Sequence, residues 1–145
     1  MKSYLFKISL SLLLILVASF SFCQVAEDIK FENQVKKFNR TDEGKLVELT
    51  YSFSYKGTVK LSIIPPKVDC SCTEVILPKS DIEPNSNNII IIRFNTKDKI
   101  GYQQREVILN FVSDAMDSRS IEKKLVFKGV VNASKETKDI YKQNK

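Results

Sequence analysis

Cys70 and Cys72, separated by one serine, are the side chains whose type and spacing best suit nucleophilic, redox or soft-metal chemistry in this 145-residue sequence. The sequence holds one further cysteine, Cys23, and no histidine. Without an imidazole base, neither a Ser-His-Asp nor a Cys-His nucleophile can be assembled. We therefore predict that the protein is not an enzyme, has no catalytic residues and needs no cofactor.

Three roles remain open for the cysteine pair. A disulfide needs Cα atoms about 4.4–6.8 Å apart, which residues i and i+2 reach in a tight turn but barely reach in an extended strand. Two thiolates could instead bind a soft ion such as Cu(I), with Asp69 or Glu74 nearby, whereas zinc would need four ligands. Free or readily reduced thiols would support redox exchange. Because so small a ring constrains the unfolded chain very little, we interpret Cys70 and Cys72 mainly as part of the loop geometry, with the thiol-redox and Cu(I) roles as alternatives.

The N-terminal segment decides which cysteine chemistry is available. Two lysines, an apolar run and a boundary with small residues make residues 1–23 typical of a secretory signal peptide. Cleavage after Cys23 would leave Gln24 as the first residue, and cleavage after Ser21 would leave Phe22. The alternatives are an uncleaved anchor and a lipid anchor through Cys23, although a lipoprotein signal needs a small residue where Phe22 stands. We predict a periplasmic or secreted protein without a membrane span after cleavage, in an oxidising compartment that favours disulfides.

The positive charge is concentrated at the two ends of the chain. The sequence has 23 basic and 17 acidic residues, a net charge of +6, of which residues 1–23 and the tail 132–145 each carry +2. The aromatic residues are not interleaved with basic clusters, so nucleic acid is not expected as a partner. The tail 132–145 is predicted to be disordered, because nearly all of its residues are polar.

The clearest structural pattern is an alternation with a period of two. Apolar and polar residues alternate along 47–55, which predicts a strand with one face on a core that includes Tyr51 and Phe53. The alternation resumes at residues 59–63 and is ended by two prolines. We predict that these two strands pair as a hairpin, with Gly57 supplying the positive φ of a tight turn.

Further strands are predicted at similar intervals, and residues 24–131 are expected to form one domain. These strands lie at residues 29–31, 35–38, 89–94, 107–111 and 121–127. The first two are predicted to be edge strands, and the apolar run 89–94, which includes Phe94, is typical of a strand buried on both faces. About seven short antiparallel strands in a single exported domain indicate an all-β, immunoglobulin-like sandwich.

The order of these segments resembles a family of secreted bacterial domains known as domain of unknown function 1573. The resemblance covers residues 29–131, and its most specific feature is a CGCT motif after a strand, followed by an I-x-P-G turn and a strand that ends in F-x-T. The matching residues are Cys70, Cys72, Thr73, Ile82, Pro84, Phe94, Thr96, Gly101 and Gly129. The resemblance implies an immunoglobulin-like sandwich of the class that includes major sperm protein and the hydin-type domains of cilia.

Two glycines of the family motif are replaced in this sequence. Ser71 stands between the cysteines, and Asn85 follows Pro84. Asparagine tolerates a left-handed backbone, so the turn at Asn85 is expected to persist, whereas Ser71 leaves the geometry of the cysteine pair open. The resemblance implies no substrate. We hypothesise an exported, non-enzymatic module that binds an unknown protein or cell-envelope component, with a sheet edge as one means of binding.

Overall fold

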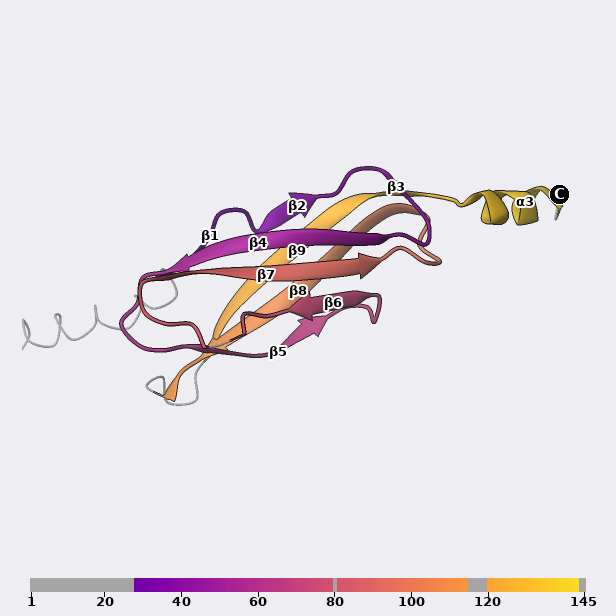
Figure 1. Cartoon of the computed structure of the whole chain (residues 1–145). Helices are drawn as coiled ribbons and strands as arrows, with labels where there is room; N and C mark the ends of the chain where they lie inside the picture. The colour runs from indigo at the N-terminus through magenta and orange to yellow at the C-terminus, as the bar shows by residue number, and fades with distance from the viewer. Residues whose placement is uncertain (1–27, 80, 115–119, 144–145) are drawn as a thin grey trace, which may run out of the picture.

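The computed structural model describes residues 28–79, 81–114 and 120–143, which form two β-sheets packed face to face (Figure 1). Sheet A has the strand order β1-β4-β7-β6, and sheet B has the order β2-β9-β8-β5 with β3 also paired to β9. The strands are β1 (Ile29–Phe31), β2 (Val35–Lys37), β3 (Thr41–Asp42), β4 (Leu46–Tyr55), β5 (Ser62–Val68), β6 (Thr73–Ile76), β7 (Ser86–Asn95), β8 (Gly101–Val112) and β9 (Ile121–Asn132). A helix, α3 (Lys135–Gln143), follows β9.

The immunoglobulin-like sandwich is confirmed, but the strand count and the direction of two strands differ from the prediction. The described residues form nine strands instead of seven, because β3 and β6 are added to those predicted. The sandwich is also not wholly antiparallel. The N-terminal segment pairs with β4 through β1, then passes to sheet B, where β2 and β3 run parallel to β9.

The predicted hairpin between β4 and β5 is wrong, because these two strands lie in different sheets. Strand β4 pairs with β1 and β7, and β5 pairs with β8. Gly57 does not have the predicted positive φ, which among the described glycines occurs at Gly44 and Gly101. A Cβ atom at Gly57 would overlap the ring of Tyr55, whose hydroxyl donates a hydrogen bond to the carbonyl of Val59 at 2.7 Å. Glycine is therefore required because the chain passes directly over this ring as it crosses between the sheets.

The core lies between the two sheets and contains the predicted aromatic residues. Tyr51, Phe53 and Phe94 are buried, and the ring centroid of Phe94 in sheet A lies 5.2 Å from that of Phe127 in sheet B. The Tyr51 hydroxyl donates a 2.8 Å hydrogen bond to the carbonyl of Val126 on β9. Burial raises the pKa of Tyr51, so the phenol stays protonated and keeps this bond between the sheets.

Three local expectations have different outcomes. The turn at Asn85 is left-handed as predicted, with φ 55°. Strand β7 is not buried on both faces, because Ile90 and Ile92 are buried while Ile89 is 54% exposed. Strand β5 does not end at its two prolines but continues through them to Val68, with a register shift between Ile64 and Lys67. Proline is tolerated there because β5 is an edge strand, where a missing N–H breaks no ladder bond.

In the described part of the tail 132–145, β9 continues to Asn132 and is followed by α3. The disorder expected for this tail in solution stays a prediction. Ser134 caps the helix by accepting a 3.1 Å hydrogen bond from the amide of Thr137. Glu43 accepts bonds from the Ser134 amide at 3.1 Å and the Thr137 hydroxyl at 2.6 Å, and the bond from Thr137 is the main cause of the lowered pKa of Glu43. No residue of α3 is buried, so the helix is held at its N-terminus and projects from the sandwich (Figure 1).

Candidate functional site

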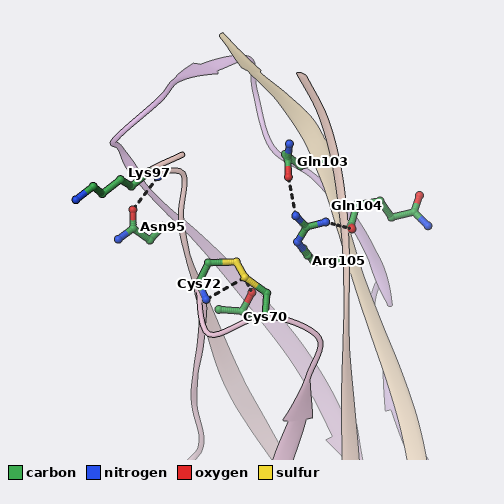
Figure 2. Close-up of a disulfide and its surroundings, with 8 residues drawn as sticks. Cys70, Cys72, Asn95, Lys97, Gln103, Gln104 and Arg105 are labelled. Carbon is green, nitrogen blue, oxygen red and sulfur yellow. Dashed lines mark hydrogen bonds between the residues drawn. A yellow bond between two sulfur atoms is a disulfide. The ribbon is translucent and has the colours of Figure 1, made fainter. Parts of the chain in front are cut away.

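The cysteine pair lies in the loop between β5 and β6. Figure 2 shows Cys70 and Cys72 joined by a disulfide, and their Cα atoms are 5.1 Å apart. The loop is a tight turn, because the amide of Thr73 donates to the carbonyl of Cys70 at 3.1 Å and the amide of Cys72 lies 3.0 Å from the Cys70 sulfur. The turn brings the cysteines within bridging distance even though Ser71 replaces the glycine of the motif.

The second half of this loop is part of sheet A. The amide of Asn95 on β7 donates a 2.8 Å hydrogen bond to the carbonyl of Cys72, and Cys72 packs against the core. Thr73 is buried and begins β6, where it pairs with Phe94. The CSCT segment therefore sets where β6 starts and how it aligns with β7.

The metal interpretation of the cysteine pair is not supported. Both sulfurs are bonded to each other and are not thiolates. Glu74, one of the two acids considered as further ligands, lies in an ion pair 3.8 Å from Arg93, and Arg93 also bonds Glu48 at 2.9 Å. Within the described ranges, no group of three cysteine, histidine, aspartate or glutamate side chains is placed to hold a metal ion.

A second cluster at this end of the sandwich was not predicted from the sequence. Arg105 on β8 lies over the ring of Phe94, with its guanidinium carbon 6.0 Å from the ring centroid. Its two Nη groups donate 2.8 Å hydrogen bonds to the carbonyl of Gln104 and to Oε1 of Gln103 (Figure 2). Gln103 in turn donates to the carbonyl of Ile100 at 3.0 Å. The cluster ties β8 to the preceding turn, and its only sequence signal is an arginine in the inward register of a strand.

Thr96 joins the loops at the same end. Its side chain is fully buried, and its hydroxyl oxygen accepts a 2.8 Å hydrogen bond from the amide of Lys45. The same hydroxyl can donate its proton to the carbonyl of Asp42 at 3.0 Å or to that of Lys45 at 2.8 Å. One hydroxyl thus connects the turn before β4 to the end of β7.

Replacing both Cys70 and Cys72 with serine is expected to lower the free energy of unfolding by about 1–2 kcal/mol, because little buried sulfur surface and little chain constraint are lost. The β-rich circular dichroism spectrum should be retained, and urea denaturation measures the difference. The control variant Ser71→Gly keeps the bridge and should unfold within about 0.5 kcal/mol of the parent. Loss of the folded spectrum, or submicromolar Cu(I) binding by the reduced parent that the double variant lacks, would contradict the structural role.

The family relationship agrees with the resemblance seen in the sequence. The family described as "protein of unknown function (DUF1573)" matches residues 29–131. The chain belongs to this DUF1573 family. The match runs from the first residue of β1 to Val131, one residue before the end of β9, so that the family domain coincides with the sandwich and excludes α3. None of the curated protein sequences matches the chain closely enough to count as a relative.

Solved structures share the sandwich of this DUF1573 domain at low sequence identity. PapD-like domain 7 of human CEP192 is 14% identical with a TM-score of 0.59, covering 74% of this chain and 87% of that one. The VesB protease of Vibrio cholerae is 10% identical with a TM-score of 0.57, covering 71% and 32%. The periplasmic chaperone SfaE is 7% identical with a TM-score of 0.53, covering 71% and 56%. At these identities the likeness shows the fold alone.

Proposed function

We propose that the protein is an exported, non-enzymatic module that binds a partner protein by strand addition to sheet A. The sequence has no histidine, and the part of the chain that the structure describes has no cluster suited to a metal ion. The common routes to a nucleophile or a metal-bound water are therefore missing. The fold is compatible with partner binding, because it is also the fold of a periplasmic chaperone.

The observation that carries this proposal is a free edge on β7. Strand β7 spans ten residues and pairs with β4 along its whole length. On its other side β6 pairs only with Ile91 to Phe94. If the register of β6 is continued, Pro78 stands opposite Ile89, and proline has no N–H to extend the ladder. Among the residues that the structure describes, the first half of β7 therefore has no neighbouring strand on this side.

The direction of the backbone groups on β7 follows from the alternation of an antiparallel ladder. The amide of Thr96 bonds to Lys45 on the β4 side, and the amide of Asn95 bonds to Cys72 on the β6 side. Odd-numbered residues of β7 thus face the β6 side. Within the described residues, neither Asn87 nor Ile89 makes a backbone hydrogen bond on that side. Their N–H and C=O groups are placed to pair with an extended segment of another protein.

The edges of sheet B are less suited to strand addition. Edge strand β5 contains Pro65 and Pro66, which remove two N–H donors and shift its register. Strands β2 and β3 are three and two residues long and do not form a continuous edge. The β7 edge also carries the exposed side chain of Ile89 and adjoins a hollow of about 520 Å³ lined in part by Ser52, Ser54 and Asn87. A partner segment can therefore bury apolar surface there as well as form backbone bonds.

A photo-crosslinking amino acid at position Asn87, introduced into the full chain in its own cells, is expected to give a discrete adduct with one partner. The same amino acid at Glu122, which is exposed on sheet B, serves as the control position. The variant Ile89→Pro removes the free N–H without breaking a bond to β4, so it should abolish the adduct at position 87 and keep the folded spectrum.

The matched variant Ile89→Val keeps the N–H and should keep the adduct. Equal crosslinking at positions 87 and 122 would mean that neighbouring proteins contact the domain without preferring the β7 edge. An adduct that persists in Ile89→Pro would place the partner elsewhere on the protein. Either result would refute strand addition at β7.

We also propose that the N-terminal signal segment is cleaved on export, after Cys23 or after Ser21. Both positions lie outside the described residues. In the described residues no helix has the length and apolar character needed to span a membrane. N-terminal sequencing of the protein from its own cells is expected to begin at Gln24 or Phe22. A diacylglyceryl-modified Cys23 detected by mass spectrometry would contradict this and place the protein on a lipid anchor.

A further inference from the structure

Sheet B carries a basic pocket where β2 ends beside β9. The pocket has a volume of about 360 Å³ and is lined by side chains from β2, from the segment that follows it, and from β8 and β9. Its cationic members are Lys37, Arg40 and Lys128, and its aromatic members are Phe38 and Tyr102. The volume is in the range of small-molecule sites.

The positive charges of this pocket have no paired carboxylate among the residues that the structure describes. Lys37 and Lys128 are register partners in neighbouring strands, an arrangement in which like charges destabilise a sheet. In the described ranges neither lysine, nor Arg40, forms an ion pair with a carboxylate. Lys124, on the same strand β9, is by contrast paired with Glu106 at 2.9 Å. An anion in the pocket would relieve a repulsion that the protein leaves uncompensated.

The walls of the pocket are fixed by backbone contact and by two rings. A Cβ atom at Gly129 would overlap the ring of Phe38, so the absence of a side chain lets Phe38 lie directly against β9. Tyr102 is 63% exposed, and its hydroxyl donates a 3.1 Å hydrogen bond to Oε1 of Gln104. Phe38 is partly buried against the core, so the exposed ring beside the cations is that of Tyr102.

We propose that this pocket binds a phosphate group. A phosphate monoester carries about −1.5 to −2 charges at neutral pH and has three strong acceptor oxygens. Each of the three cations could therefore bond one oxygen. A carboxylate would neutralise only one of them. Arg40 can bond two oxygens at once, and the lysines can act as point charges on the rest. The proposal stands independently of strand addition, because the pocket is on sheet B and the free edge is on sheet A.

Titration of the isotope-labelled mature protein with inorganic phosphate at low ionic strength tests this site by nuclear magnetic resonance. The amides of Gly129 and Val130 are expected to shift and to saturate in the millimolar range. The double variant Lys37→Gln, Lys128→Gln should bind phosphate at least about tenfold more weakly, because two charge-assisted hydrogen bonds are lost. The control Lys67→Gln removes an exposed charge at the opposite edge of sheet B and should change the affinity by less than about twofold.

Two results would overturn the proposal. Amide chemical-shift changes could be spread over the whole surface, and Lys67→Gln could weaken the affinity as much as the double variant does. That result would mean that phosphate is attracted by the net positive charge and does not bind at a specific site. Acetate that binds as tightly as phosphate would mean that the pocket does not select a doubly charged group.

A vesicle sedimentation assay distinguishes a lipid headgroup from a soluble phosphate ester as the ligand. Phosphatidylcholine vesicles containing phosphatidic acid should sediment the parent and not the double variant if the group belongs to a lipid headgroup. No sedimentation, together with saturable binding of inorganic phosphate, assigns the group to a soluble ester. Sedimentation that the double variant retains would count against the pocket.

Discussion

Replacing Phe94 with alanine is expected to lower the free energy of unfolding by about 3–5 kcal/mol, the usual cost of truncating a fully buried aromatic side chain. Phe94 has no exposed surface, and its ring centroid lies 5.2 Å from that of Phe127 and 5.9 Å from that of Phe38. Alanine would leave a cavity between the sheets and uncover one face of the Arg105 guanidinium. Urea denaturation followed by circular dichroism measures the loss.

The matched control is Ile89→Ala on the same strand. Ile89 is 54% exposed, so its truncation should cost less than about 1 kcal/mol. Losses of similar size in the two variants would contradict the assignment of Phe94 to the centre of the core. They would also contradict the outward position of Ile89, which gives the free edge of β7 its exposed apolar side chain.

Strands with several full periods of alternation were predictable from the sequence. In β4 each inward residue repeats the signal of the one before it, so Tyr51 and Phe53 were placed in the core correctly. Strands β2 and β3 contain three and two residues, which is at most one period and a half. Their parallel pairing with β9 depends on where the chain crosses between the sheets. The local alternation of apolar and polar residues does not indicate that position.

The hairpin prediction failed for a related reason. Alternation on both sides of Gly57 shows that two strands are close in sequence, but hairpin pairing and a crossover between sheets leave the same pattern. The crossover is seen in the pairing of β4 with β7 and of β5 with β8, and glycine is needed at position 57 because a side chain there would overlap Tyr55. Only the packed structure contains that information.

The candidate sites divide in the same way. The cysteine pair could be found from the sequence because its members are two residues apart, and the turn that joins them is local. Lys37 and Lys128 meet only because β2 lies against β9. The free edge of β7 likewise needs the register that puts Pro78 opposite Ile89, which follows from the pairing of Thr73 with Phe94. Sites built from long-range pairing become visible only with the sheet order.

Replacing Thr96 with valine is expected to lower the free energy of unfolding by about 2–4 kcal/mol, although the two side chains have nearly the same shape. The change removes the acceptor of the Lys45 amide and the donor that serves the Asp42 and Lys45 carbonyls. A buried polar group that loses its partner costs about 1–3 kcal/mol. The Lys45 amide and the carbonyl that accepts the hydroxyl proton each lose a hydrogen bond, although the Lys45 carbonyl keeps its bond from the Thr96 amide. Denaturation midpoints measure the effect.

The variant Thr96→Ser separates the hydroxyl from the methyl group. Serine keeps the three contacts of the oxygen and loses one buried methyl, so it should cost only about 1 kcal/mol. If valine proved as mild as serine, the bonds at Thr96 would be dispensable, and packing alone would hold the end of β7 against the turn before β4. If valine is the more damaging change, as the geometry requires, the fold needs the hydroxyl of Thr96. The CSCT loop would depend on it indirectly, because Asn95, which bonds the carbonyl of Cys72, is the residue before Thr96.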